Sequence, residues 1–197
     1  GFDHTYGPAD IANMALLPPY VNGRFDVYTV NKLSEGAVDE KVSSTNIRKL
    51  VDEGQIGQAN QLLGYEYTTT GIIVHGFARG RTFGFPTANV HWYENERIPA
   101  VGVYAVRMKV QGRWVDGMAS VGFNETFGQN KRMTIEINLF NFNHHIYGEH
   151  VTVQWVQRLR DEVKFSSVQE LINQLKKDQT TSEQILADNQ FSGISVK

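Results

Sequence analysis

A series of short, closely spaced strand patterns beginning near residue 68 restricts the fold of this 197-residue chain more than any other feature. Residues 101–110 and 133–140 alternate apolar and polar side chains, which is the period of a strand with one buried face. Gln111-Gly112 supplies a hairpin turn after the first of these segments. The other predicted strands are residues 68–75, 114–121 and 150–156. Short strands joined by turns favour a small antiparallel, Greek-key-like β-barrel, so we predict a mainly β (α+β) fold.

The first third of the chain does not resemble a complete domain. Residues 25–30 are rich in β-branched and aromatic side chains, and they predict one strand. Ser44 or Thr45 can cap a helix that ends at Gly54. A second short helix is predicted over residues 56–63.

The C-terminal part of the chain is predicted to be helical. Ser167 and Glu170 form the capping-box pattern, with a hydroxyl at the helix start and a carboxylate three residues later. The apolar stripe that follows consists of Val168, Leu171, Ile172 and Leu175. This stripe must pack against the barrel. A separate, shorter helix is predicted from Thr180 to about Ala187.

Composition excludes several classes of protein. The formal net charge of −2, from 19 basic and 21 acidic side chains, argues against a general nucleic-acid binder. No apolar run approaches the roughly 18 residues of a membrane span, so no membrane partner is expected. The absence of cysteine excludes disulfides and zinc-thiolate sites and suits a cytoplasmic location. The chain begins without methionine, and we expect it to be part of a longer protein.

A glycine-rich loop, Gly76–Asn89, follows the first predicted strand. Its three glycines, spaced four residues apart, let the backbone approach a large ligand closely, and two arginines add positive charge. Pro86 favours extended backbone, so the side chains of Thr87 and Asn89 point the same way. A hydroxyl and an amide oxygen side by side suit a Mg²⁺ ion that carries substrate phosphates, which suggests a nucleotide site. From the residues alone, a solvated surface loop is an equal alternative.

The loop resembles the signature of the riboflavin kinase family. His75–Arg81 matches H-G-x-x-x-G-R, and Gly84–Asn89 matches G-F-P-T-A-N. A second family motif, T-x-E-x-x-L-x-x-F, matches Thr134–Phe142. The resemblance implies a kinase that transfers the γ-phosphoryl group of Mg²⁺-bound ATP to riboflavin, with FMN and ADP as products.

The same resemblance implies roles for individual residues. Glu136 falls on the family's general base for the riboflavin 5′-hydroxyl, although from periodicity alone it is a solvated strand glutamate. The positions implied at ATP are Gly76, Arg81, Thr87, Asn89 and Tyr147, and Thr87 and Asn89 are also implied at Mg²⁺. The positions implied at the flavin are Arg160 and Phe165. For Tyr147, Arg160 and Phe165, ordinary packing and capping are the alternative.

The segment before the barrel resembles the FMN adenylyltransferase half of bifunctional bacterial riboflavin kinase/FMN adenylyltransferases, or FAD synthetases. The residues that match its I-S-S-T-x-I-R motif include Ser43, Ser44, Thr45 and Arg48. Plain helix capping is the alternative. That half's ATP-gripping motif, G-x-F-D-G-x-H-x-G-H, is absent, so adenylyl transfer is expected only in a longer protein. The predicted divisions are 1–64, the C-terminal remnant of an α/β nucleotidyltransferase domain, 65–188, a riboflavin kinase domain, and 189–197, a tail.

Two other functions stay open. One is a barrel that binds flavin or nucleotide without turnover, and the other is a chain whose main role is FMN adenylylation with its first half missing. Glu125 stands where the family usually has proline, and Asn141 replaces a frequent aspartate. His144-His145 suggests a metal site, but adjacent side chains on a strand or turn diverge. The oligomeric state is not predicted.

Overall fold

The computed structural model describes residues 4–8, 10–29, 42–76, 79–125 and 131–189, and the chain divides into compact units at Ser43/Ser44. The first unit contains the short helix α1 (Pro18–Val21), which ends where Asn22 takes a left-handed φ of 47°. The strand predicted over residues 25–30 is wrong for its described part, since residues 25–29 are not in a strand. Its apolar residues find no neighbouring strand among the described residues, and an unpaired strand leaves its backbone polar groups without partners.

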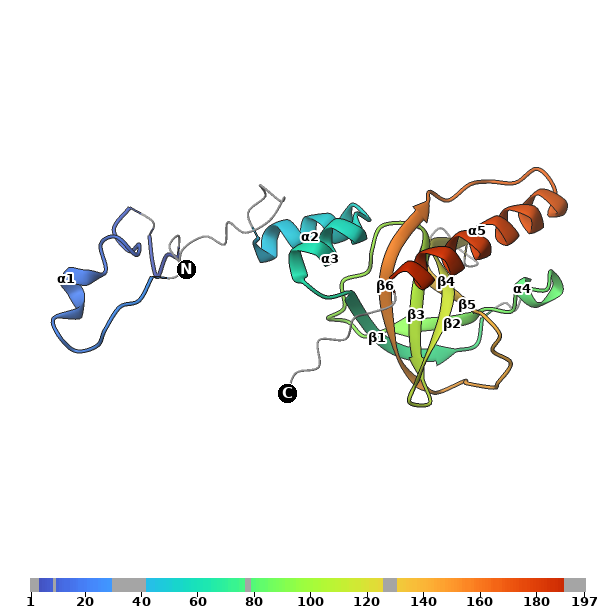
Figure 1. The fold of residues 1–197 in the computed structure, drawn as a ribbon, viewed down its shortest axis with the longest axis horizontal. Helices are drawn as coiled ribbons and strands as arrows, with labels where there is room; N and C mark the ends of the chain where they lie inside the picture. Colours follow the sequence, from blue (N-terminus) through green and yellow to red (C-terminus); the bar gives the residue numbers. More distant parts are fainter. Residues whose placement is uncertain (1–3, 9, 30–41, 77–78, 126–130, 190–197) are drawn as a thin grey trace. The chain divides into compact units, whose positions relative to one another are not determined.

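The second unit is built around a closed barrel, which confirms the predicted fold (Figure 1). The six strands are β1 (Tyr67–Val74), β2 (Ala88–Trp92), β3 (Gly102–Val110), β4 (Arg113–Glu125), β5 (Lys131–Leu139) and β6 (His150–Arg160). Around the barrel they run in the order β1-β2-β5-β4-β3-β6, and each neighbouring pair is antiparallel. The pairs β2–β5 and β1–β6 join strands that are distant in sequence, which gives the barrel its Greek-key character.

The barrel interior is filled with side chains. Trp155 is fully buried at its centre, where its indole Nε1 donates a hydrogen bond of 3.0 Å to Thr69 Oγ1. Tyr104 meets the Trp155 ring edge-on, with ring centroids 5.3 Å apart. A barrel of six strands has room for packed side chains and little else. A ligand site on this domain therefore belongs on the outer wall.

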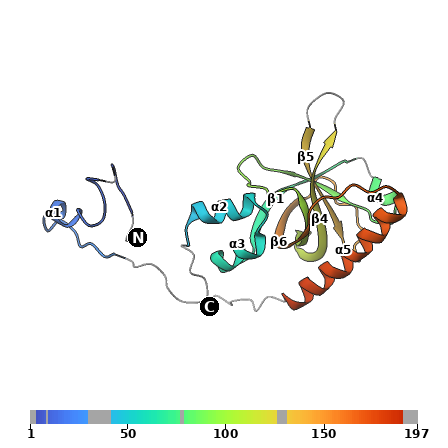
Figure 2. The same ribbon diagram turned by 90° about the horizontal axis from the view of Figure 1, so that it is seen from above.

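Helix α5 (Val168–Asp188) lies along the outside of the barrel, as the two ribbon views agree (Figures 1 and 2). Ser167 caps it by accepting a hydrogen bond from the Glu170 backbone N–H, as the sequence predicts. The residues of a second apolar cluster, between this helix and the barrel wall, are Phe85, Ala105, Met118, Phe140, Val156 and Leu186. Burial of these side chains holds the helix in place.

The separate helix predicted from Thr180 is wrong, because α5 runs through this region without a break. The hydroxyls of Thr180 and Thr181 donate to the carbonyl oxygens of Lys176 and Lys177, one turn earlier. Serine and threonine side chains make such bonds inside helices as well as at caps. The sequence pattern could not distinguish the two arrangements.

Helices α2 (Ser44–Asp52) and α3 (Ile56–Leu63) pack onto the barrel, and each is followed by a left-handed glycine, Gly54 (φ 73°) and Gly64 (φ 76°). Both helices are confirmed. The side chains that they contribute to the main barrel core are Leu50, Val51, Ile56 and Ala59. Asn60 adds hydrogen bonds to the Trp155 carbonyl and the Tyr67 N–H, at 2.9 and 2.8 Å. The compact unit that holds the barrel thus begins at Ser44, whereas the sequence divides the chain after residue 64.

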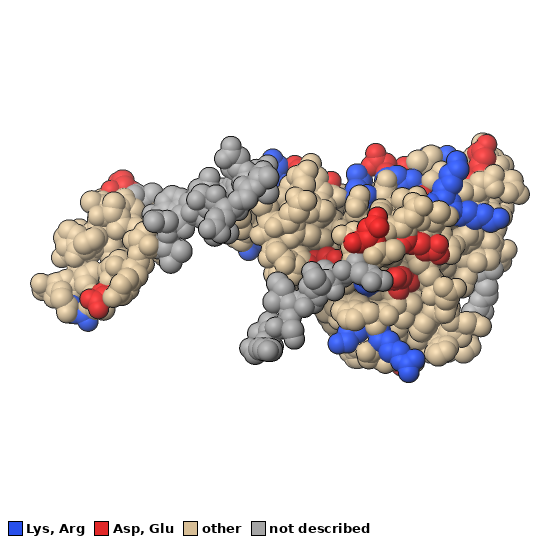
Figure 3. All heavy atoms as spheres, in the orientation of Figure 1, with Lys and Arg blue, Asp and Glu red and all other residues tan. Residues whose placement is uncertain are grey.

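On the face of the described residues seen in Figure 3, Lys and Arg side chains are interspersed with Asp and Glu. Within the part of the chain that the structure describes, no helix combines the length and apolar character needed to span a bilayer.

Candidate active site

The described part of the loop between β1 and β2 contains two glycines that lie very close to neighbouring groups. A Cβ at Gly76 would overlap the Asn89 side-chain amide, and a Cβ at Gly80 would overlap the Phe85 carbonyl oxygen. A one-turn helix, α4 (Arg79–Thr82), forms the middle of the loop. Because glycine has no Cβ, it is the residue that fits such close approaches without displacing the neighbouring atoms. The side chain of Arg81, predicted at ATP, lies outside the described part of the structure.

Barrel pairing brings Thr87, Asn89 and Glu136 together. Asn89 lies directly opposite Glu136 across the β2–β5 pair, and Thr87 Oγ1 donates to Glu136 Oε2 at 3.3 Å. Val90 lies in the barrel core and Ala88 packs against it, so the alternating polar residues face outward. The pair from the loop and the acid from a distant strand therefore form one cluster.

Asn138 fixes the backbone that carries Thr87. Its side-chain Nδ2 donates to the Pro86 carbonyl at 2.8 Å, and the residue is only 7% exposed. Sequence reasoning gave Asn138 no role beyond the polar face of its strand. The only available signal was the polar alternation Thr134-Glu136-Asn138, which marks the face and not the partner.

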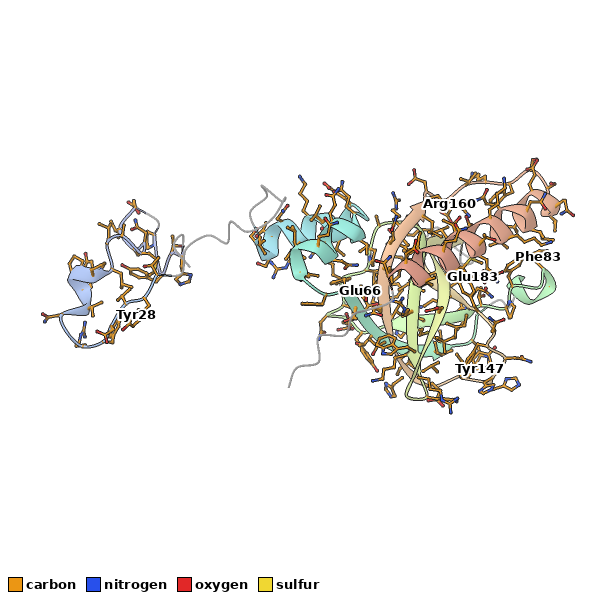
Figure 4. The ribbon with its side chains drawn as sticks, viewed as in Figure 1. Tyr28, Glu66, Phe83, Tyr147, Arg160 and Glu183 are labelled. Atoms are coloured by element: carbon orange, nitrogen blue, oxygen red, sulfur yellow. The ribbon has the colours of Figure 1, made fainter. Side chains whose placement is uncertain are left out.

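A cavity of about 360 Å³ lies beside this cluster, between the barrel wall and α5. Its apolar lining comes from the loop, the wall and the helix, and includes Phe83, Phe85, Val103, Met118, Val163, Phe165, Leu171 and Leu175. Its polar lining includes Thr87, Ser120, Glu136, Asn138, Arg160, Glu162 and Asp178. Figure 4 shows Phe83 at α4 and Arg160 near α5. A mostly apolar hollow with a few converging polar groups is typical of a small-molecule site.

The predicted flavin-side residues Arg160 and Phe165 both line this cavity. The Arg160 guanidinium lies 5.9 Å from the centre of the Phe165 ring. The Arg160 guanidinium also forms an ion pair with Asp178 of α5, in which Nη2 donates a hydrogen bond to Oδ2 at 2.6 Å. Sequence reasoning did not single out Asp178, because an aspartate inside a polar helix segment carries no local sign of burial.

Tyr147 lies on the β5–β6 connection, away from α5 (Figure 4). Its ring stacks on His75, with ring centroids 3.8 Å apart and the planes inclined by 21°. Both His144 and His145 join Tyr147 in lining a second, smaller cavity of about 100 Å³. Thr87 lines both cavities, so it lies between them. Among the described residues, no group of three or more His, Cys, Asp or Glu side chains is arranged to hold a metal ion.

The remaining predicted positions lie elsewhere. Of the motif residues, Ser43 precedes α2, Ser44 and Thr45 are its first two residues, and Arg48 lies one turn further along the helix. None of these residues lines either of the two cavities. Asn141 has a left-handed φ of 52° at an exposed turn after β5. Glu125 ends β4, and its side chain lies outside the described part of the structure.

Comparison with known proteins gives consistent matches. The family model described as riboflavin kinase, or flavokinase, matches residues 63–186. A bifunctional riboflavin kinase/FMN adenylyltransferase from Listeria monocytogenes is 46% identical over 187 residues, which is 95% of this chain and 59% of the relative. The Bacillus subtilis protein of the same description is 41% identical over 180 residues, covering 90% of this chain and 56% of the relative. The chain thus spans somewhat more than half the length of these curated relatives.

A solved structure shares the fold over most of the chain. It is a crystal structure described as a macrolide-efflux protein from Streptococcus pneumoniae. The match has a TM-score of 0.83 and 41% sequence identity, and it covers 93% of this chain and 58% of that one.

Proposed function

This chain belongs to the riboflavin kinase family, and from that premise we propose that it transfers the γ-phosphoryl group of ATP to the 5′-hydroxyl of riboflavin. The products are FMN and ADP. The observation that carries the proposal is the contact between Thr87 and Glu136, because Thr87 lines both cavities. A flavin in the larger cavity and a nucleotide at Tyr147 would bring their reacting groups to this contact.

Glu136 is the proposed general base. Its carboxylate takes the proton of the riboflavin 5′-hydroxyl while that oxygen bonds to the γ-phosphorus, and the bond from phosphorus to the ADP oxygen breaks. A positioned base contributes about 10²–10⁴ in rate. The 3.3 Å contact with Thr87 supports this role, because it holds one carboxylate oxygen beside the loop that faces the nucleotide.

Thr87 and Asn89 are the residues proposed to hold Mg²⁺. The Thr87 hydroxyl donates its hydrogen bond to Glu136, which leaves its oxygen lone pairs for a cation, while Asn89 supplies an amide oxygen on the same face. Hard oxygen donors of this kind suit Mg²⁺. When bound with ATP, the ion would offset negative charge on the transferring phosphoryl group. Gly76 leaves the space that the Asn89 amide occupies.

The proposal extends to the whole protein. Because the relatives are bifunctional and longer, we infer that residues 1–64 are the end of an adenylyltransferase half. In that reading Ser43, Ser44, Thr45 and Arg48 belong to that half's phosphate site, and FMN adenylylation requires the longer protein. Riboflavin and ATP are the proposed small-molecule partners. The cytoplasm is the proposed location of the protein.

The test is conversion of riboflavin by the purified chain with ATP and Mg²⁺, followed by chromatographic separation of FMN. We expect Glu136→Gln to keep flavin binding and to lower kcat by about 10²–10⁴. Glu53→Gln is the matched control, since it makes the same change at an exposed carboxylate in the turn that follows α2. Its activity should equal that of the wild type.

Three other results of this test would contradict the proposal or favour an alternative function. Unchanged FMN formation by the Glu136→Gln protein would show that the base is misassigned. Flavin binding by the wild type without any FMN would favour a binding barrel. Formation of FAD from FMN and ATP by this chain would show that adenylyl transfer does not need the longer protein.

A further inference from the structure

Asp178 is the most deeply buried charged residue of α5. It is 4% exposed, and it lines the larger cavity one turn beyond Leu175. Its Oδ1 accepts hydrogen bonds from Arg160 Nε at 3.0 Å and from Gln174 Nε2 at 2.8 Å. Its Oδ2 accepts from Arg160 Nη2 at 2.6 Å. Two parallel bonds of this kind fix both the distance and the plane of a guanidinium.

The contacts of Arg160 determine what its guanidinium can offer to a ligand. Its Nη1 donates to the Asp161 carbonyl at 2.9 Å, in addition to the two donors that face Asp178. Among the described residues, these bonds use three of the five N–H groups of an arginine, which leaves two. The charge is balanced by the buried carboxylate. Glu162 also lines the cavity, so this edge presents hydrogen-bond donors without excess positive charge, which suits a neutral carbonyl oxygen better than a phosphate.

The same ion pair joins two walls of the cavity. Arg160 ends β6, and the segment that follows it carries Val163 and Phe165 into the cavity lining. Asp178 is on α5, which contributes Leu171 and Leu175. The separation of these two walls is the width available to a flat ring. Removing one partner of a buried ion pair leaves the other charge uncompensated, so the wall would move to let water in.

We propose that Asp178 is a positioning residue for the ring end of the cavity. By holding Arg160 in place, it sets the width and the hydrogen-bonding character of the edge that receives an uncharged, flat heteroaromatic ring. The inference rests on the proposed function, because it assigns this cavity to the flavin.

The test separates ring binding from catalysis. Binding of lumiflavin, the flavin ring without its ribityl chain, is measured by fluorescence quenching without ATP. We expect Asp178→Asn to weaken lumiflavin binding and raise the KM for riboflavin by about tenfold or more, which corresponds to about 1.4 kcal/mol. The KM for ATP and the kcat at saturating riboflavin should stay within about twofold of the wild type. A merely structural role would not produce this division between the two substrates.

Two further variants sharpen the result. Asp178→Glu keeps the carboxylate and should recover part of the lost affinity. Glu183→Gln is the matched control on the same helix, because its carboxylate is exposed and accepts a hydrogen bond from the Gln179 side chain one turn earlier. Arg160→Lys keeps a cation beside Asp178 but loses the planar fork. It should show the same selective loss of ring binding, and it serves as the test if Asp178→Asn does not fold.

The inference is overturned if a folded Asp178→Asn protein binds lumiflavin like the wild type, or if its affinities for ATP and riboflavin fall equally. Failure of both Asp178→Asn and Arg160→Lys to fold would also overturn it, since the pair would then serve the fold alone. A wild type that binds lumiflavin but makes no FMN would contradict the proposed function and leave the inference standing.

Discussion

Gly76 lies so close to Asn89 that a single added methyl group must displace the Asn89 amide. Gly76→Ala should therefore lower FMN formation by about tenfold or more, because a displacement of about 1 Å at a positioning group can cost up to about 10² in rate. The loss should be reduced in part by raising the Mg²⁺ concentration. The measurement is kcat/KM for ATP over a range of Mg²⁺ concentrations.

Gly57→Ala is the control for this substitution. A Cβ at Gly57 meets nothing within 4 Å, and the residue lies inside α3. Alanine there should leave FMN formation unchanged and raise the free energy of unfolding by about 0.4–1 kcal/mol. Full activity of the Gly76→Ala protein would remove Asn89 from the proposed Mg²⁺ site.

Glu66 is a buried carboxylate at the start of the barrel (Figure 4). Burial raises its pKa above the ordinary value of 4.5, and Arg107, with Nη1 3.6 Å from Glu66 Oε1, lowers the pKa in part. The folded protein then holds this proton at pH values where the unfolded chain has released it. The stability that this group contributes is complete below pH 4.5 and declines as pH rises through the folded pKa.

Glu66→Gln cannot ionise, so the variant should lack this decline. We expect its free energy of unfolding, relative to that of the wild type, to increase as pH rises above 4.5. Urea unfolding at pH values from about 4 to 7.5 measures the difference. A pH-independent difference would contradict the raised pKa.

Glu170→Gln should show the opposite trend. Hydrogen bonds from Ser166 hold the pKa of Glu170 below its ordinary value of 4.5. The contribution of this exposed carboxylate to stability is therefore present above pH 4.5 and is lost as pH falls through the folded pKa.

At the level of elements, substitution of the serine that caps α5 and of the serine buried within it should have different effects on stability. Ser167 caps the helix by accepting from the Glu170 N–H at 3.2 Å. Ser182 is fully buried within the helix, and its hydroxyl finds no hydrogen-bond partner among the described residues. Ser167→Ala should lower the free energy of unfolding by about 1 kcal/mol. Ser182→Ala should leave it unchanged or raise it, because an unpaired buried hydroxyl is removed.

Thermal and urea unfolding of the two alanine variants check this prediction. The comparison also tests the continuity of α5. If a new helix began near Thr180, as the sequence suggested, Ser182 would lie in its first turn and its loss would be destabilising.

At the scale of the whole molecule, the place where the chain divides can be tested by truncation. A protein that begins at Ser44 keeps α2 and α3 and the side chains they bury in the barrel core. It should retain FMN formation and the melting temperature of the barrel. A protein that begins at Tyr65 loses Leu50, Val51 and Ile56 from that core. Its free energy of unfolding should fall by several kcal/mol, since each fully buried aliphatic side chain contributes about 1.5–3 kcal/mol.

Differential scanning calorimetry and the FMN assay on the two truncated proteins give the answer. Equal stability would mean that α2 and α3 are dispensable to the barrel. It would then favour the sequence division after residue 64 as the physical boundary.

Much of the barrel could be predicted from the sequence because the relevant signals are local. Alternation along residues 133–140 reports which face of β5 is buried, and the left-handed turn at Gln111-Gly112 reports a hairpin. The strand predicted over residues 25–30 and the helix start at Thr180 failed for the same reason. Propensity and hydroxyl patterns describe what a segment can do, while its neighbours decide which option is realised.

The candidate site shows the same division. Residue types alone indicated that Thr87 and Asn89 share a face and that Glu136 lies opposite the apolar side of its strand. That these residues meet follows from the pairing of β2 with β5, which joins positions 49 residues apart. The burial of Asp178 against Arg160, and the cavity between α5 and the barrel, likewise arise only when the helix docks. Side-chain periodicity is a property of a few neighbouring residues, whereas strand order and helix docking depend on how the closed barrel buries its surface, so they are visible only in the folded chain.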